Sequence, residues 1–306
     1  MERRVVAIVG PTASGKSDIA FLIAKELKTE IISADSRQIF KELNIGTAKP
    51  SKNYLDEIKH HFINTISVTE KYDVGKFVDE ARLIIKKLHD ENKIPVVVGG
   101  SGLYIHSLFY GIFEGPEADD DLRKSLEKEI EENGIESLVK KLKSLDPETH
   151  SRIDKNNPRR IIRALEVIYK TGKPISQLQK QTTLKPDYDI KLIGLNWDRK
   201  VLYERINSRV DKMIETGLVD EVRRIIDQYG SNINIILYTV GYKEVIEFLN
   251  GNISIEEMIQ LIKRNTRRYA KRQMTWFRKN KEIIWMDVKS ESEFPLIAQK
   301  IIQTFK

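Results

Sequence analysis

Cysteine is absent from all 306 residues. This absence excludes disulfides, a thiolate nucleophile and cysteine-ligated zinc. The sequence also lacks any apolar run approaching the roughly 20 residues that span a bilayer, so we expect no membrane segment. The first residues lead directly into a predicted strand and leave no room for a signal peptide. These absences together favour a cytoplasmic protein.

Histidine is scarce, with five residues in the chain. His60 and His61 are adjacent, but no third ligand stands at metal-binding spacing, so we expect no histidine-built metal site. A Ser-His-Asp hydrolase is equally unsupported, because the sequence contains no nucleophile elbow.

Acidic residues are missing from residues 263–281, which contain nine Lys or Arg. Because the net charge of the chain is +7, this segment accounts for the whole positive excess. On a helix that turns 100° per residue, all nine cations fall in one half-circle. Most apolar residues, including Ile262, Tyr269 and Trp276, fall in the other half, while Leu261 and Met274 lie outside it. An ordinary solvated face mixes both signs, so the pattern favours a polyanion-binding ridge anchored by its apolar side.

Short β-branched runs alternate with helical patterns in the first third of the chain, which is typical of a parallel sheet with crossover helices. The predicted strands and helices here are Arg4–Val9, Ser17–Leu27, Glu30–Ala34, Val74–His89 and Ile94–Val98. Further strands are predicted at Lys191–Asn196 and Ile283–Val288, with helices from Val201 to about Asn280 between them. We therefore predict an α/β fold, a P-loop NTPase-like parallel sheet core flanked by helices.

The pattern changes near Gly115, where the strand signals stop and charged helical sequence begins. We predict that residues 116–189 form an inserted all-helical domain. The α/β core then consists of residues 1–115 and 190–306, the second part carrying the C-terminal helices.

A complete G-x-x-x-x-G-K-[ST] motif lies between a predicted strand and a predicted helix. Its residues are Gly10, Pro11, Thr12, Ala13, Ser14, Gly15, Lys16 and Ser17. In such a P-loop, backbone N–H groups turn inward around phosphate oxygens and the helix dipole favours the anion. Lys16 is expected to meet the terminal phosphate, and the Ser17 hydroxyl to meet Mg²⁺. The motif indicates phosphate binding without fixing the reaction.

Two polar residues follow other predicted strands, at the edge where ligands gather in parallel sheets. Asp35 could bind Mg²⁺ or accept a proton, or it could cap the next helix. Ser101, within Gly99-Gly100-Ser101-Gly102, could meet a ligand or cap its own helix. The strand before Ser101 ends without an acidic residue, unlike a Walker B strand, which argues against a standard ATPase.

Three arginines open a predicted helix after Asn157-Pro158. Arg159, Arg160 and Arg163 lie on neighbouring turns and could clamp phosphates. Alternatively, they pair with nearby acidic side chains.

Several ordered blocks together resemble the bacterial tRNA dimethylallyltransferases, and the resemblance covers nearly the whole chain. The blocks are GPTASGKS (10–17), IISADSRQIF (31–40), IGTAKP (45–50), VVVGGSGLYI (96–105), NPRRIIRALEV (157–167), RVDKMIETGLVDEV (209–222), VGYKE (240–244) and KRQMTWFRK (271–279). The family transfers a dimethylallyl group from dimethylallyl diphosphate to N6 of adenosine 37, beside the tRNA anticodon. Its fold is a P-loop core with a helical insertion that closes on the tRNA.

This resemblance implies roles for individual residues. The P-loop holds the diphosphate of the donor, with Mg²⁺ at Ser17, and Asp35 is the general base. Lys16, Mg²⁺ and an arginine, for which Arg209 is our candidate, stabilise the departing diphosphate. Ser101 takes the place of a threonine that is common in the family; its hydroxyl is retained and a methyl contact is lost.

The resemblance, together with the basic segment, also implies a tRNA-binding set for the anticodon stem-loop. Its members are Asp35, Ser36, Arg37, Gln38, Ser101, Arg123, Arg159, Arg160, Ile161, Ile162, Arg163, Arg267, Arg268, Lys271 and Arg272. No segment indicates self-association, so we expect a monomer.

Three other functions compete with this interpretation. A small-molecule kinase would use the P-loop for ATP and Asp35 as base, and would leave the basic segment unexplained. A noncatalytic RNA-binding module would leave the P-loop without a role. An adenylate prenyltransferase is closer, but the basic segment and the large insertion favour tRNA.

Overall fold

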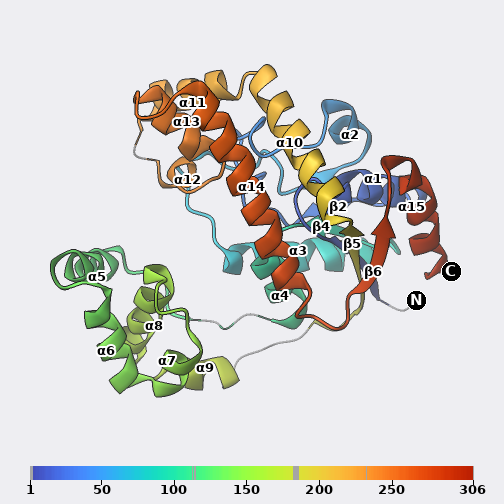
Figure 1. Cartoon of the computed structure of the whole chain (residues 1–306). Coiled ribbons are helices and arrows are strands. Elements are labelled where there is room, and N and C mark those ends of the chain that lie inside the picture. The colour runs from blue at the N-terminus through green and yellow to red at the C-terminus, as the bar shows by residue number, and fades with distance from the viewer. Residues whose placement is uncertain (1–2, 112, 114, 182–185, 232, 306) are drawn as a thin grey trace. The chain divides into compact units, whose positions relative to one another are not determined.

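The computed structural model describes residues 3–111, 113, 115–181, 186–231 and 233–305 (Figure 1). The chain forms two compact units. One consists of Met1–Phe109 with Asp187–Lys306, and the other of Tyr110–Pro186. The sequence placed the insertion at residues 116–189, so the second unit starts and ends a few residues earlier than this.

The first unit is built on a six-stranded sheet in which every pairing is parallel, in the order β3-β2-β4-β1-β5-β6. The strands are β1 (Arg4–Val9), β2 (Ile31–Ser33), β3 (His60–His61), β4 (Val96–Gly99), β5 (Asp189–Trp197) and β6 (Ile284–Val288). The predicted parallel α/β core is confirmed. The sequence did not predict β3, because two residues at the edge of a sheet carry no periodic signal.

Helices surround this sheet. They are α1 (Lys16–Glu26), α2 (Lys52–Glu57), α3 (Val74–Asp90), α4 (Gly102–Tyr110), α10 (Arg199–Glu215), α11 (Leu218–Tyr229), α12 (Asn234–Leu237), α13 (Tyr242–Leu249), α14 (Ile255–Phe277) and α15 (Phe294–Gln303). The central strand β1 is fully buried along Val5–Val9, as its unbroken β-branched sequence requires. Side chains of α1 and α15, such as Ile19 and Ile301, pack in the same core as this strand. Among the described helices, none is long and apolar enough to cross a membrane.

The strand register aligns the loops that matter for function. Val9, the last residue of β1, pairs with Gly99 of β4 on one side and with Gly194 of β5 on the other. Ser33, which ends β2, pairs with Val98 of β4. The loops that follow these strands therefore leave the sheet at one edge, where ligands bind in open α/β folds.

The second unit is helical. Its elements are α5 (Asp120–Asn133), α6 (Ile135–Leu145), α7 (Pro147–Arg152), α8 (Pro158–Thr171) and α9 (Ile175–Gln181). Its core contains Leu138, Leu142 and Leu165, which are each fully buried. Asn157 caps α8 by accepting a hydrogen bond from the backbone N–H of Arg160, with a proline at the first turn, a combination that starts helices.

Asp146 joins α7 to α9 inside this unit. Its buried carboxylate accepts hydrogen bonds from the N–H and hydroxyl of Thr149 and from the N–H and hydroxyl of Ser176. Burial alone would raise the pKa of Asp146, but these hydrogen bonds outweigh it and lower the pKa below its ordinary value. The ionised carboxylate is therefore the form that stabilises the fold.

We predict that Asp146→Asn destabilises this unit by about 1–3 kcal/mol at neutral pH, because one amide group cannot accept all four hydrogen bonds. Since the folded pKa is depressed, the stabilisation is full above the unfolded pKa of about 3.9 and is lost as the pH falls through the folded pKa. Hydrogen exchange of α7 and α9 in the full chain should therefore differ from wild type at neutral pH and converge with it in acid. Exposed Glu131→Gln is the control; equal exchange of Asp146→Asn and wild type at neutral pH would contradict the prediction.

Candidate active site

The P-loop connects β1 to α1, as the motif predicted. The helix begins at Lys16 rather than Ser17. Gly15 has φ +82, and a Cβ there would lie 2.1 Å from the Phe294 ring, so both the backbone and the packing require glycine. The Lys16 ammonium donates a hydrogen bond to the carbonyl oxygen of Pro11 at 2.7 Å.

The Lys16 ammonium lies where both poor solvation and a neighbouring positive charge disfavour its charged form. Burial, followed by the positive charge of Arg209, lowers its pKa to about 8, and the Asp35 carboxylate opposes this shift. Arg209, from α10, is part-buried, and its guanidinium lies 3.4 Å from the Thr12 hydroxyl. Burial and the nearby Arg205 lower the pKa of Arg209 as well. Two cations thus stand at the loop, and an anion placed between them would stabilise both.

Asp35 follows β2 and faces the same cavity. One of its carboxylate oxygens accepts hydrogen bonds from the backbone N–H groups of Arg37 and Gln38, at 2.9 and 3.4 Å. Residues 36–39 form a turn and no helix. Asp35 therefore caps a turn, and it is also available to the cavity.

Ser101 precedes α4 and connects its loop to that of Asp35. Its hydroxyl oxygen accepts a hydrogen bond from the Ser36 backbone N–H at 3.0 Å. The Arg37 guanidinium in turn donates to the Ser36 carbonyl oxygen. The loops after β2 and β4 are thus held together beside the P-loop.

Two glutamine side chains form hydrogen bonds that connect further segments to the loops around the cavity. Gln38 donates to the carbonyl oxygens of Thr47 and Ala48, which holds the loop of residues 45–50 at the cavity. Gln273, on α14, accepts from the Thr12 N–H and donates to the Gly100 carbonyl oxygen, both at 2.9 Å. The buried amide of Gln273 therefore joins the P-loop to the loop that carries Ser101.

These segments enclose one cavity of about 820 Å³. It is lined by residues 12–17 of the P-loop, and also by Asp35, Ser36, Arg37, Gln38, Ser101 and Arg209. Gly10 and Pro11 are not among the described residues that line it. The sequence blocks 45–50 and 240–244, to which no role was given, contribute Gly46, Thr47, Ala48, Lys49, Pro50, Val240 and Gly241.

One face of α14 forms a wall of the cavity. It consists of Ile262, Thr266, Tyr269, Gln273 and Trp276, spaced alternately by four and three residues. The sequence interpretation treated Ile262, Tyr269 and Trp276 as an apolar anchor. That was wrong in part, because helical spacing shows which residues share a face but does not show whether the face meets the core or a cavity.

The basic segment also differs from its prediction. Helix α14 ends at Phe277, so Arg278, Lys279 and Lys281 follow the helix. Lys263 forms an ion pair with Asp211 of α10 at 2.5 Å. Figure 1 shows α14 beside α10.

Arg267 also turns toward α10, where its guanidinium donates to the Asn207 side chain at 2.6 Å. The exposed cations on α14 are Arg264, Arg268, Lys271 and Arg272. Arg272 lines the cavity as well.

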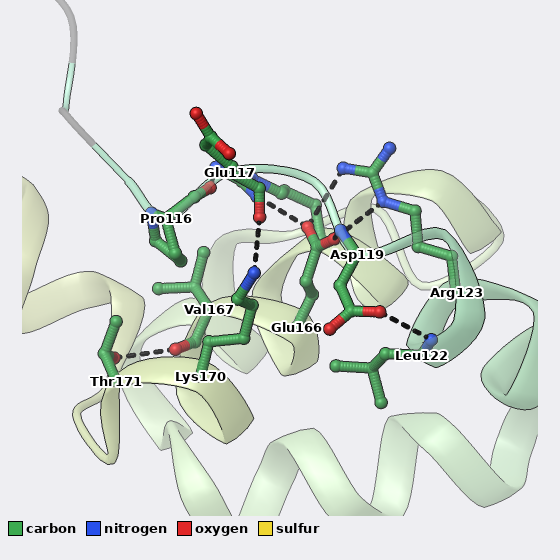
Figure 2. A network of polar contacts seen from close by, with 10 residues as sticks. Pro116, Glu117, Asp119, Leu122, Arg123, Glu166, Val167, Lys170 and Thr171 are labelled. Carbon is green, nitrogen blue, oxygen red and sulfur yellow. Dashed lines mark hydrogen bonds and ion pairs between the residues drawn. The ribbon is translucent and has the colours of Figure 1, made fainter.

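In the second unit, Arg123 and Arg163 both donate hydrogen bonds to the carboxylate of Glu166, and Figure 2 shows Arg123 beside Glu166. Glu166 is fully buried and accepts two hydrogen bonds from Arg123, one from Arg163 and one from the Asp119 N–H. Burial raises the pKa of Glu166, but these bonds outweigh it, so the pKa lies below its ordinary value. The pairing with a local acid that the sequence left open is therefore present for Arg163.

The remaining residues of this unit that the resemblance implies for tRNA binding differ in solvent exposure. Arg159 and Arg160 are exposed at the start of α8. Ile161 and Ile162 are 0% and 5% exposed, and they pack the core of the unit. The resemblance carried these two isoleucines over with their block, and their burial argues against side-chain contacts with RNA.

Metal binding fits this site only in a limited way. Among the described residues, no group of three or more His, Cys, Asp or Glu could hold an ion. Mg²⁺ usually keeps several waters and binds largely through substrate phosphates, and in a P-loop the protein ligand is the hydroxyl of the Ser or Thr that follows the lysine. Ser17, which lines the cavity beside Lys16, meets that requirement for an ion carried mainly by a diphosphate.

The chain is similar to proteins of known activity along its whole length. A family profile described as IPP transferase matches residues 38–280. The tRNA dimethylallyltransferase of Christiangramia forsetii is 47% identical, over 98% of this chain and 99% of that protein. The tRNA dimethylallyltransferase of Alkaliphilus oremlandii is 43% identical, over 100% of this chain and 98% of that protein.

Solved structures agree with these sequence matches. The tRNA isopentenylpyrophosphate transferase of Bacillus halodurans aligns with a TM-score of 0.72 and 38% identity, covering 99% of this chain and 96% of that one. A eukaryotic dimethylallyltransferase acting on tRNA aligns with a TM-score of 0.83 and 27% identity, covering 97% of this chain and 77% of that one.

The lowered pKa of Lys16 predicts how anion binding depends on pH. Below about 8 the ammonium is charged in the free protein, and above it the charge is lost, so the affinity for inorganic pyrophosphate should fall by up to about tenfold per pH unit. Titration calorimetry of wild type and Lys16→Arg checks this. The arginine stays charged, and pyrophosphate itself titrates in the same way in both experiments. The difference between the two pH profiles therefore reports the titration of Lys16. Parallel pH profiles for the two proteins would contradict the prediction.

Proposed function

The chain belongs to the IPP transferase family, and we propose that it transfers the dimethylallyl group of dimethylallyl diphosphate to N6 of adenosine 37 in tRNA. The observation that supports this most directly is the single cavity that joins a phosphate-binding loop to a carboxylate. Lys16 and Arg209 stand at one part of that cavity, and Asp35 at another. A diphosphate leaving group and a proton acceptor can thus serve one reaction.

The adenine amine is a weak nucleophile, because its lone pair is delocalised into the ring. In the proposed reaction N6 forms a bond to C1 of the dimethylallyl group while the bond from C1 to the diphosphate oxygen breaks. Asp35 accepts the proton that N6 loses. Lys16, Arg209 and inward-facing P-loop N–H groups stabilise the negative charge that develops on the diphosphate.

Two groups support Asp35 and the leaving group. The Ser101 hydroxyl, bonded to Ser36, fixes the loop that carries Asp35 and can also meet the substrate. Mg²⁺ bound through the diphosphate and Ser17 would supply further positive charge at the leaving group.

We propose two surfaces for tRNA. In the first unit, Arg268, Lys271 and Arg272 are exposed on α14, and Arg272 extends to the cavity where the adenosine would enter. In the second unit, Arg159 and Arg160 are exposed at the start of α8, beside the part-exposed Arg123 and Arg163. Exposed cations of this kind bind phosphates irrespective of base sequence.

Incubation with labelled dimethylallyl diphosphate, Mg²⁺ and undermodified tRNA tests the function. We expect label in the RNA, and digestion should place it on adenosine 37. Asp35→Asn should lower turnover by roughly 10²- to 10⁴-fold with little change in pyrophosphate affinity. An asparagine oxygen can still cap the turn at Arg37 and Gln38, so a turn cap alone would leave turnover near normal.

Two outcomes would reject these assignments. Consumption of ATP with a small acceptor, together with unlabelled RNA, would reject the proposed function in favour of a kinase. Near-normal turnover of Asp35→Asn would reject Asp35 as the base and leave the function in place.

A second prediction concerns α14. Lys271→Gln should weaken tRNA binding and lower the slope of log affinity against log salt by about 0.7–0.9, because one phosphate contact is lost. The matched control is Lys263→Gln combined with Asp211→Asn, which removes the ion pair without changing net charge. Filter binding across a salt series measures both, and an unchanged slope for Lys271→Gln would remove this face from the tRNA-binding surface.

A further inference from the structure

We infer that Trp197 and Arg205 are positioning residues that hold the phosphate-binding backbone in its binding shape. Neither is among the described residues that line the cavity, so neither is placed to touch the substrate. Both contact the P-loop from its other side. The inference rests on the proposed function only in naming diphosphate as the anion.

The contacts are made to consecutive carbonyl groups. The Arg205 Nε–H donates to the Ala13 carbonyl oxygen at 2.8 Å. The Trp197 indole N–H donates to the Ser14 carbonyl oxygen at 3.0 Å, in a buried contact. Two side chains from β5 and α10 thus bind the middle of the loop.

Because of the geometry of the peptide bond, hydrogen bonds to these carbonyl groups also orient the N–H groups of the following residues. In a planar trans peptide, the C=O of one residue and the N–H of the next point in opposite directions. A hydrogen bond that holds the Ala13 carbonyl away from the cavity therefore turns the Ser14 N–H toward it. The Ser14 carbonyl does the same for the N–H of Gly15. Trp197 and Arg205 orient the very donors that a phosphate needs.

The backbone at this point needs such support. Ala13 has φ +63, in the left-handed region that residues with a Cβ rarely adopt. Conformations of this kind persist where surrounding contacts over-determine them. The hydrogen bonds on the Ala13 and Ser14 carbonyls are contacts of that type.

Other residues fix Arg205 and Trp197 in turn. The Arg205 guanidinium lies 4.3 Å from the centre of the Trp197 ring and forms an ion pair with Glu291 at 2.5 Å. The Trp197 and Phe294 rings pack nearly perpendicular to each other, with their centroids 6.3 Å apart, and the Phe294 ring also covers Gly15. The loop is therefore supported by a packed set of side chains.

Arg205 and Arg209 lie one turn apart on α10 and have different roles at the P-loop. Arg209 lines the cavity and lies beside Thr12, where it can meet the anion directly. Arg205 has its charge balanced by Glu291 and its Nε–H engaged by the loop. We therefore expect Arg205 to act through geometry and Arg209 through charge.

Two variants test the inference. Trp197→Phe removes the indole N–H and keeps an aromatic ring, and Arg205→Lys keeps the charge and removes the Nε donor and the planar stack. Each should raise the dissociation constant of Mg²⁺-pyrophosphate and the KM for dimethylallyl diphosphate by roughly 3- to 30-fold. The affinity for tRNA should stay within twofold of wild type, and kcat at saturating donor should fall less than the KM rises.

Arg199→Lys is the matched control, because Arg199 stacks on Tyr203 from the same helix without contacting the P-loop; its pyrophosphate affinity should equal that of wild type. Binding is measured by calorimetry well below the unfolding temperature of every variant, so that a loss of stability is scored separately. If Trp197→Phe and Arg205→Lys bind pyrophosphate as wild type does, the inference is overturned. If they bind weakly while wild-type protein binds pyrophosphate and prenylates no tRNA, the proposed function fails and the inference stands.

Discussion

The parallel register of the central strands is the constraint on which the site depends. Because Val9 pairs with both Gly99 and Gly194, β1 and β4 end at the same level, and β5 continues beyond them to Trp197. Each of these strands is followed by a segment that contacts the P-loop or belongs to it. A slip of one residue would also reverse the faces of the buried side chains, so packing of the core and assembly of the site enforce the same register.

The electrostatics of the assembled cavity favour an anion. Lys16 and Arg209 are desolvated together, and burial is the main cause of the lowered pKa of each. The free protein thus keeps two cations where water solvates them poorly, which is unfavourable until an anion arrives. Asp35 lies close enough to raise the Lys16 pKa, and in the proposed reaction it is the group that accepts the proton from N6.

Local sequence was sufficient for the features that local physics determines. The P-loop, the buried strand β1 and the helix that begins at Asn157-Pro158 were all predicted from spacing and residue type. Gln273, Trp197 and Arg205 escaped notice because their partners lie far away in the chain; the indole of Trp197 meets a carbonyl 183 residues earlier. Side-chain burial was the other property that the sequence could not predict. The sequence Arg160-Ile161-Ile162-Arg163 is equally compatible with isoleucines that face RNA and with isoleucines that face the core.

The insertion between α4 and β5 has a consequence for how the chain matures. Strand β5 lies beside β1 in the middle of the sheet, yet residues 110–186 must be synthesised before it emerges. Until then, β1 presents an open edge, and open edges pair with other chains. The Trp197 and Arg205 donors also arrive only at that stage, so the P-loop motif is present in the nascent chain long before the contacts that shape it. During synthesis the nascent chain thus passes through a period in which it is open to aggregation and not yet shaped to bind its donor.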